Sequence, residues 1–128
     1  MAGVSKGAAG EVLAARFLRE KGYRVVASNF RCRQGEIDII AVHDRYIVFV
    51  EVKTRREGAM YAPREAVTAA KQRRLLLTAA VYLSRSPVEL QPRFDVVEVV
   101  TCANNPMKAV EIDHIIGAYE AGDLGAAF

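Results

Sequence analysis

Hydrophobic residues recur along the chain with two periods, one typical of helices and one typical of strands. Helical spacing runs from Ser5, an expected N-cap, to Gly22, an expected helix end. A second helical stretch opens at Pro63, a residue favoured in the first turn of a helix, and continues to about Ser84. Pro87 prevents this helix from continuing much further. The pattern therefore predicts two main helices.

Short segments before and after the second helix have the composition of β-strands. These segments are residues 23–27, 36–42, 47–53 and 94–100. The second and third are almost continuously apolar, which is typical of central strands covered on both faces. A short strand near residues 109–112 and a weak terminal helix are expected beyond them. The order predicts one α/β domain over residues 1–128, with a core of about 5–100 and a C-terminal extension over 101–128.

The register of the central hairpin gathers charged residues at one corner of the sheet. A two-residue loop at 44–45 fixes which residues of the two middle strands face each other, and it places Asp38 opposite Glu51. Two residues further along, Glu36 faces Lys53. Because side chains alternate along a strand, all four are expected on one face. That face also carries Ile40, Val42, Ile47 and Phe49, and the opposite face carries Ile37, Ile39, Ala41, Val48, Val50 and Val52.

Asp38 beside Glu51 forms a like-charge pair in a sheet that is otherwise apolar on both faces. A divalent cation would compensate both charges, and Mg²⁺ commonly uses one or two carboxylates together with water and phosphate oxygens. The choice between Mg²⁺ and Mn²⁺ stays open. Lys53, one pleat beyond Glu51, could orient or deprotonate a water molecule or stabilise a developing oxyanion. The alternative is structural: Glu36 and Lys53 form a cross-strand salt bridge, and the other two acids simply reach solvent.

Composition excludes several classes of protein. With 52% hydrophobic and 26% charged residues among 128, the chain has the balance of a globular domain rather than of a disordered, collagenous or coiled-coil protein. Its longest uncharged apolar run, residues 75–84, is much shorter than the ~20 residues of a membrane span. Cys32 and Cys102 lie far apart and have no metal or redox spacing. We therefore expect a cytoplasmic protein with reduced thiols and no membrane partner.

Charge is segregated along the chain although the net charge is only +3. Bases predominate in residues 16–33 and again in 53–74, whereas acids predominate in 101–128. If the two basic segments share a face, they form the footprint expected for a polyanion such as nucleic acid, whereas the alternative is a role in solubility. The candidates for contacts with the nucleic-acid backbone are Arg55, Arg56, Lys71, Arg73 and Arg74. Lys71 lies on or beside the inward stripe of the second helix, where it either reaches the acidic corner or a phosphate, or only packs its stem on the core.

Two sequence blocks carry a resemblance to a known group of enzymes. Gly35, Glu36, Ile37 and Asp38, followed later by Glu51, Val52 and Lys53, resemble the PD-(D/E)xK signature of restriction-endonuclease-like nucleases. With the runs at residues 6–11, 29–31 and 49–55, the chain is similar more specifically to the YraN-like bacterial family, which resembles archaeal Holliday junction resolvases. The resemblance covers about residues 5–100. It implies a restriction-endonuclease-like core of a helix, a three-strand antiparallel meander, a helix and a further strand in a mixed central sheet flanked by helices.

The resemblance also assigns roles to single residues. It implies that Asp38 and Glu51 are metal ligands, that Lys53 is the catalytic lysine, and that Glu11 is the acidic residue such nucleases often place on the first helix. Helical spacing puts Glu11 close to Leu18, on the core-facing side. The alternative for Glu11 is a favourable charge near the positive end of the helix dipole.

Two classes of function stay open. The first is a Mg²⁺-dependent endonuclease that hydrolyses phosphodiester bonds in DNA, with branched or distorted DNA as the finer expectation, by metal-activated attack of water. The second is a nucleic-acid-binding or scaffold protein that keeps the nuclease fold with little turnover. A homodimer is open in both classes. His43 and His114 are separated and lack ligand spacing, so both are expected to be structural.

Overall fold

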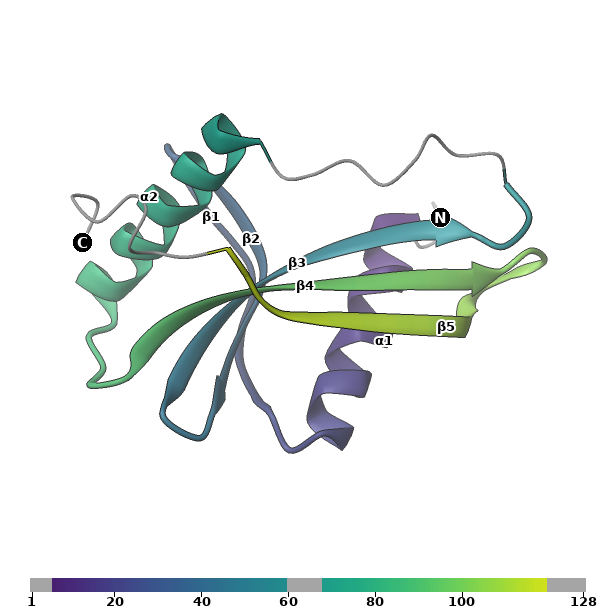
Figure 1. Cartoon of the computed structure of the whole chain (residues 1–128), viewed down its shortest axis with the longest axis horizontal. Coiled ribbons are helices and arrows are strands. Elements are labelled where there is room, and N and C mark those ends of the chain that lie inside the picture. Colours follow the sequence, from purple (N-terminus) through teal and green to yellow (C-terminus); the bar gives the residue numbers. More distant parts are fainter. Residues whose placement is uncertain (1–5, 60–67, 120–128) are drawn as a thin grey trace, which may run out of the picture.

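A computed structural model of the chain describes residues 6–59 and 68–119. Within those ranges, five strands form one mixed sheet with a helix packed on each face (Figure 1). In chain order the elements are α1 (Lys6–Glu20), β1 (Arg24–Cys32), β2 (Gly35–His43), β3 (Tyr46–Arg56), α2 (Ala69–Arg85), β4 (Gln91–Cys102) and β5 (Asn105–Tyr119). The strands lie side by side in this same order; β3 and β4 are parallel and the other neighbours are antiparallel. The predicted mixed α/β fold with a restriction-endonuclease-like core is confirmed.

The hairpin of β2 and β3 has the predicted register over its first half. Pairing runs from His43 with Tyr46 to Ile39 with Val50, and Asp44 has the positive φ of 55° that a tight two-residue hairpin turn requires. The predicted pairs beyond this point are wrong, because the ladder ends at Ile39. From there β2 turns away while β3 continues along β4, so the two strands separate (Figure 1).

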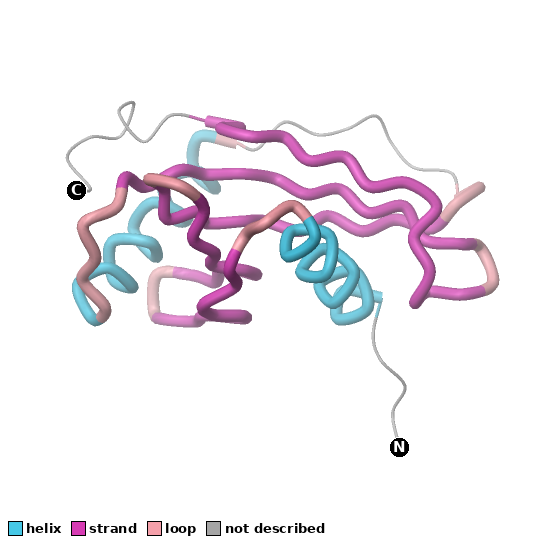
Figure 2. The backbone as a smooth tube through the Cα atoms, turned by 90° about the horizontal axis from the view of Figure 1, so that it is seen from below, coloured by secondary structure: helices cyan, strands magenta, loops and turns pink. Residues whose placement is uncertain are grey.

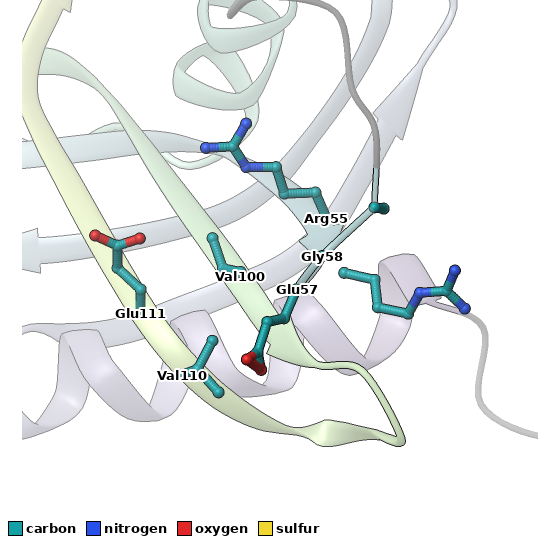
Figure 3. A pocket seen from close by; sticks show the side chains of 8 residues that line it. Arg55, Glu57, Gly58, Val100, Val110 and Glu111 are labelled. Atoms are coloured by element: carbon teal, nitrogen blue, oxygen red, sulfur yellow. The ribbon is translucent and has the colours of Figure 1, made fainter.

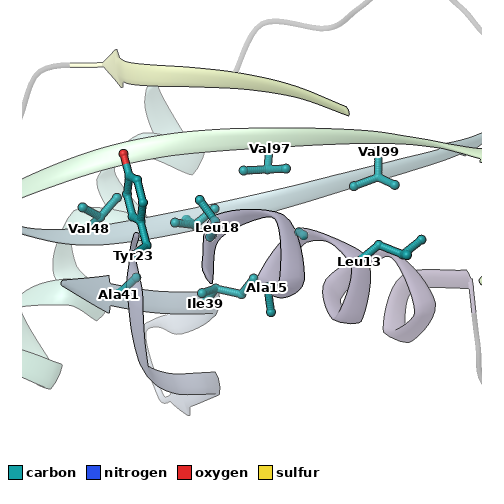
Figure 4. Close-up of a cluster of buried hydrophobic side chains, with 11 residues drawn as sticks. Leu13, Ala15, Leu18, Tyr23, Ile39, Ala41, Val48, Val97 and Val99 are labelled. Atoms are coloured by element: carbon teal, nitrogen blue, oxygen red, sulfur yellow. The ribbon is translucent and has the colours of Figure 1, made fainter. Parts of the chain in front are cut away.

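Helix α1 covers one face of the sheet. Figure 4 shows side chains of α1 against β2, β3 and β4, in a cluster formed by Leu13, Ala14, Ala15, Leu18, Tyr23, Ile39, Ala41, Val48, Val50, Val97 and Val99. Complete burial of Leu18 alone contributes about 2 kcal/mol to stability. Gly10 lets the helix approach β3 closely, since a Cβ at this position would overlap the side chain of Thr54.

Helix α2 covers the opposite face, so that the sheet separates the two helices (Figure 2). The cluster beneath α2 contains Ile37, Ile40, Ile47, Phe49, Leu76, Ala79 and Phe94. The predicted division of hairpin residues between the faces holds for the paired part of the strands. It is wrong for Ile37, which packs with Ile40 rather than with Ile39, because β2 is no longer held flat against β3 at this point.

The observed elements differ from the predicted ones mainly at their ends, most clearly in α2 and β1. Helix α2 begins at Ala69, with Thr68 as an N-cap whose side chain accepts the N–H of Lys71; the predicted start at Pro63 lies outside the described residues. The predicted first strand is too short, since β1 continues along β2 as far as Cys32.

The C-terminal extension is more regular than its sequence indicates. In place of a short strand at 109–112 followed by a weak helix, the chain forms β5, which pairs with β4 from Asn105 to Tyr119. Residues 120–128, where that helix would continue, lie outside the described residues. The long neighbouring strand β4 offers a ladder of hydrogen bonds that overrides the weak local preference. Neither helix in the described ranges is long and apolar enough to cross a membrane.

Candidate functional site

Asp38 lies where β2 and β3 separate. Its Oδ2 accepts a hydrogen bond of 2.8 Å from the backbone N–H of Val52, a residue of β3 just beyond the last backbone pair between β2 and β3. Burial raises the pKa of the Asp38 carboxyl above its ordinary value, and the charges of Glu36 and Glu51 raise it further. The hydrogen bond from Val52 and the charge of Lys71 oppose this rise. The fold thus fixes the position of this carboxylate without fully compensating its charge.

Glu51 projects from β3 toward α2. Its side chain is only 13% exposed, and its Oε1 is paired with Nζ of Lys71. Its second oxygen, Oε2, is buried and has no hydrogen-bond partner among the described residues. A buried carboxylate oxygen without a donor is costly, so Glu51 has one compensated and one uncompensated oxygen.

Glu11 approaches the same corner from α1. Burial raises the pKa of its carboxyl, and the charges of Asp38 and Glu36 raise it further, which places the three acids within electrostatic reach of one another. Asn29, a β1 residue with a left-handed φ of 54°, hydrogen-bonds to this carboxyl. Within the described ranges, Oε1 of Glu11 is a second buried oxygen that has no hydrogen-bond partner. The structure therefore brings Glu11 toward the acidic corner, as the resemblance implies.

Lys53 and Glu36 are arranged differently from the predicted cross-strand pair. Lys53 is half-buried and follows Glu51 by two residues, on the same face of β3. Glu36 lies opposite Arg31 of β1 and forms a salt bridge with it, with 3.1 Å between Oε2 and Nε. The predicted strand pairing of Glu36 with Lys53 is wrong, since β2 pairs with β1 at this level and no longer with β3.

These acids have the chemistry of a Mg²⁺ or Mn²⁺ site. Such cations prefer oxygen ligands, and Glu11 and Glu51 each present a buried oxygen that lacks a donor in the described part of the chain. Among residues 6–59 and 68–119, no three acidic, histidine or cysteine side chains lie close enough to form a complete ligand set. A site with few carboxylates, completed by water and substrate oxygens, is the form in which proteins usually hold Mg²⁺. The residues present therefore fit this cation.

Comparison with models of known protein families identifies the family of this chain. Residues 10–99 match the model of a family described as "Uncharacterised protein family UPF0102". The chain belongs to the UPF0102 family. The match extends from α1 into β4 and includes Glu11, Asp38, Glu51 and Lys53. The YraN-like resemblance is thereby confirmed as a family relationship, and it carries no statement of activity.

UPF0102 proteins of several bacteria are similar over most of the chain. One from Symbiobacterium thermophilum is 58% identical over 94 residues, which cover 73% of this chain and 80% of the relative. One from Caldanaerobacter subterraneus subsp. tengcongensis is 43% identical over 116 residues, covering 88% and 93%. One from Chlorobaculum tepidum is 43% identical over 122 residues, covering 93% and 95%. The similarity to two of these relatives thus extends over nearly the full length of both proteins.

The predicted nucleic-acid-binding residues of this UPF0102 chain divide into two groups. Lys71 and Arg74 line a pocket between α2 and the turn that joins β1 to β2. Arg73, on the same helix, is exposed and is not part of this lining. Arg55 and Arg56 line a different pocket at the far end of β3 (Figure 3). Arg55 follows Glu51 by four residues, which corresponds to roughly 13 Å along a strand.

The pocket at the far end of β3 has a mixed charge. Besides the two arginines it is lined by Glu57, Glu111, Val100 and Val110, which come from the end of β3 and from β4 and β5 (Figure 3). Carboxylates repel phosphate oxygens, so this pocket is less suited to a polyanion than the one beside α2. The structure thus separates residues that the charge pattern had grouped together.

Three residues near the site were not selected from the sequence. Arg31 pairs with Glu36, and Arg33 lines the pocket beside α2. Tyr119 is the last residue of β5; burial raises its pKa, and the charge of Glu51 raises it further, so its hydroxyl stays protonated. Arg31 belongs to one of the runs that carry the family resemblance, which was an available signal. Tyr119 comes from a distant strand, and its spacing in the sequence gives no signal.

Proposed function

We propose that this UPF0102 protein is a metal-dependent nuclease that hydrolyses phosphodiester bonds in DNA. The observation that carries the proposal is the pair of buried, unpartnered carboxylate oxygens, on Glu11 and on Glu51 among the described residues, on either side of Asp38 at the split between β2 and β3. Burial raises the pKa of Asp38 and of Glu11, and acids perturbed in this way are found at functional sites more often than at structural ones.

Each residue of the corner has a role in this proposal. Asp38 and Glu51 hold a Mg²⁺ or Mn²⁺ ion, and Glu11 adds negative charge from α1. Such an ion makes water a stronger nucleophile and offsets the negative charge of the phosphodiester. The N–H of Val52 orients Asp38 and so limits the freedom of one ligand. Lys53, on the face of Glu51, orients or deprotonates the attacking water or donates to the developing oxyanion.

Basic residues beside the corner bind the DNA backbone in this proposal. Arg33, Lys71 and Arg74 surround a pocket next to Glu36, so a bound phosphate would lie close to the acids. Arginine and lysine contacts to phosphate confer affinity without sequence preference. This is consistent with a nuclease that recognises DNA structure, and branched or distorted DNA is our specific proposal. A homodimer would suit a substrate with two symmetric strands.

A second candidate is a nucleic-acid-binding or scaffold protein with little turnover. The ion pair between Lys71 and Glu51 favours this candidate, because it already supplies one positive charge to the acidic corner. In this case the corner would stabilise the fold or hold a regulatory cation, and the basic pocket alone would bind DNA.

Cleavage assays distinguish the two candidates. Purified wild type, Glu51→Gln and the matched control Glu89→Gln, an exposed residue in the α2–β4 connection, are incubated with labelled linear, nicked, flap and four-way DNA, with and without Mg²⁺ or Mn²⁺. We expect metal-dependent cleavage by wild type and Glu89→Gln, and a loss of about a hundredfold or more in Glu51→Gln. Equal cleavage by all three proteins would indicate a contaminant. Binding without cleavage by all three would favour the second candidate.

A further inference from the structure

Lys71 occupies a position between the acidic corner and solvent. It lies in the first turns of α2, and its ammonium is paired with Oε1 of Glu51. The Lys71 side chain is 43% exposed, whereas that of Glu51 is 13% exposed. The positive charge therefore covers a nearly buried carboxylate from the open side. A cation that binds Glu51 from solvent has to meet this ammonium.

The same lysine also lines the basic pocket. The other lining residues are Arg33, Gln34, Gly35, Glu36, Arg74 and Leu75, from the β1–β2 turn and from α2. The turn is held against the helix at Gly35, where a Cβ would lie 3.0 Å from Oγ1 of Thr78 and where φ is +155°. Lys71 thus has an anion on one side and, on the other, a pocket that contains two further cationic side chains.

We propose that Lys71 is an exchangeable counter-ion that pairs with Glu51 before a divalent cation binds and with a DNA phosphate in the basic pocket afterwards. This inference rests on the proposed nuclease function. A divalent cation and an ammonium repel each other at one carboxylate, so binding of the metal weakens the contact of Lys71 with Glu51. The flexible four-carbon stem of lysine allows its ammonium to move between two anions.

The exchange couples the metal to the DNA. In the pocket, where one carboxylate, that of Glu36, lies beside Arg33 and Arg74, an ammonium released from Glu51 pairs with an incoming phosphate, so the metal and the phosphate each favour the binding of the other. Such coupling is reciprocal: DNA must raise the affinity for the metal by the same factor by which the metal raises the affinity for DNA. A lysine that served only as a permanent structural ion pair would add nothing to the coupling that arises from direct contact between the metal and a phosphate.

Substitution of Lys71 distinguishes an exchangeable counter-ion from a permanent structural ion pair. We would measure Mn²⁺ affinity by titration calorimetry, with and without a phosphorothioate duplex that resists hydrolysis, for wild type, Lys71→Met and Lys71→Gln. Without DNA, we expect both variants to bind Mn²⁺ about three- to tenfold more tightly than wild type, because the competing charge is gone. We expect the factor by which DNA raises Mn²⁺ affinity to fall in both variants, to the part that comes from direct contact of the metal with a phosphate oxygen.

Two arginine variants serve as matched controls. Arg74→Met removes a charge from the pocket that does not pair with Glu51, so it should weaken DNA binding and leave Mn²⁺ affinity without DNA unchanged. Arg45→Met, in the exposed β2–β3 turn, should change neither quantity. Circular dichroism and thermal unfolding confirm that each variant is folded.

The outcomes distinguish this proposal from the function on which it rests. If wild type binds Mn²⁺ and cleaves DNA but Lys71→Met and Lys71→Gln bind Mn²⁺ no more tightly, the exchange is wrong and the nuclease proposal stands. If both variants keep the full coupling between Mn²⁺ and DNA, the exchange is likewise wrong. If wild type binds no Mn²⁺ at all, both proposals fail together.

Discussion

Two acidic clusters in the same sheet are compensated to very different degrees. The Asp95 carboxylate of β4 is completely buried and accepts two hydrogen bonds of 2.9 Å from Arg93 and one of 3.0 Å from the backbone N–H of Gly117. His114 Nε2 lies 2.7 Å from Oδ2 of the same carboxylate. Both oxygens of Asp95 therefore have partners, whereas the corner at the split of β2 and β3 keeps buried oxygens that have none in the described part of the chain.

The pKa values of the two clusters move in opposite directions. Burial raises the pKa of Asp95, but hydrogen bonds from His114 and Arg93 outweigh burial and hold it below the ordinary value. At the other cluster, burial and neighbouring charges leave the pKa of Asp38 and of Glu11 raised. This fold can therefore fully satisfy a buried carboxylate. The buried oxygens left without a donor at the other cluster support the metal site proposed above.

Removal of the Asp95 charge should have the largest effect on stability. In Asp95→Asn the guanidinium of Arg93, which is only 15% exposed, loses its anionic partner. Breaking a buried ion pair in this way typically costs about 3–5 kcal/mol, and we expect a loss at the lower end of that range because the amide still accepts one hydrogen bond. Urea unfolding at neutral pH measures this loss. A loss below about 1 kcal/mol would show that the cluster is not a structural centre.

The sequence predicted those features that depend on local pattern. The loop at 44–45 and the alternation of apolar residues correctly predicted the register from His43 to Ile39. The separation of the strands beyond Ile39 could not be predicted in this way, because it depends on β1 and β4 holding β2 and β3 apart.

The Asp95 cluster shows more clearly which contacts cannot be predicted from the sequence. Its members come from β4, from β5 and from Tyr23, the residue before β1, whose hydroxyl accepts a hydrogen bond from Arg93; no spacing in the sequence connects His114 or Tyr23 with the pair of Arg93 and Asp95. The expectation that His114 is structural agrees with its contact with Asp95, although the partner was not predicted. Lys71 reaches the acidic corner, which was one of the alternatives that its place on the second helix offered; its pairing with Glu51 was not predicted, because the packed core sets how α2 is rotated against β3.

Loss of the His114 contact should have a smaller effect on the Asp95 cluster. In His114→Gln, Asp95 keeps Arg93 and Gly117 as donors, so we expect a loss of about 1–2 kcal/mol in unfolding free energy. The matched control is His43→Gln, because His43 stacks on the ring of Tyr23 at 4.1 Å in the same region. Equal losses in both variants would mean that ring packing, rather than the contact with Asp95, explains the effect.

Neutralisation of Asp38 should preserve stability while removing function. In Asp38→Asn the side-chain oxygen can still accept the N–H of Val52, and the repulsion from Glu36 and Glu51 disappears. We expect the unfolding free energy to stay the same or to rise by up to about 1 kcal/mol, with loss of Mn²⁺ binding and cleavage. Urea unfolding and calorimetry measure the two effects. A large destabilisation would place Asp38 with Asp95 as a structural acid and remove the contrast between the clusters.

The smallest expected effect is a pH dependence of opposite sign in the two clusters. Because the pKa of Asp38 is raised, the folded state takes up a proton before the unfolded state does as pH falls, and protonation stabilises wild type. The stability advantage of Asp38→Asn over wild type should therefore shrink as pH falls from the raised pKa to the ordinary pKa of about 3.9. Because the pKa of Asp95 is lowered, the stability that its carboxylate contributes is present above the ordinary value and is lost only as pH falls through the lowered value.

Unfolding free energies at pH 7 and in steps down to about pH 4 should therefore converge for Asp38→Asn and wild type, by about a few tenths of a kcal/mol after solvent screening. Over the same steps the gap between Asp95→Asn and wild type should stay nearly constant, and a gap that closed above pH 4 would contradict the assignment of Asp95 as a fully compensated acid.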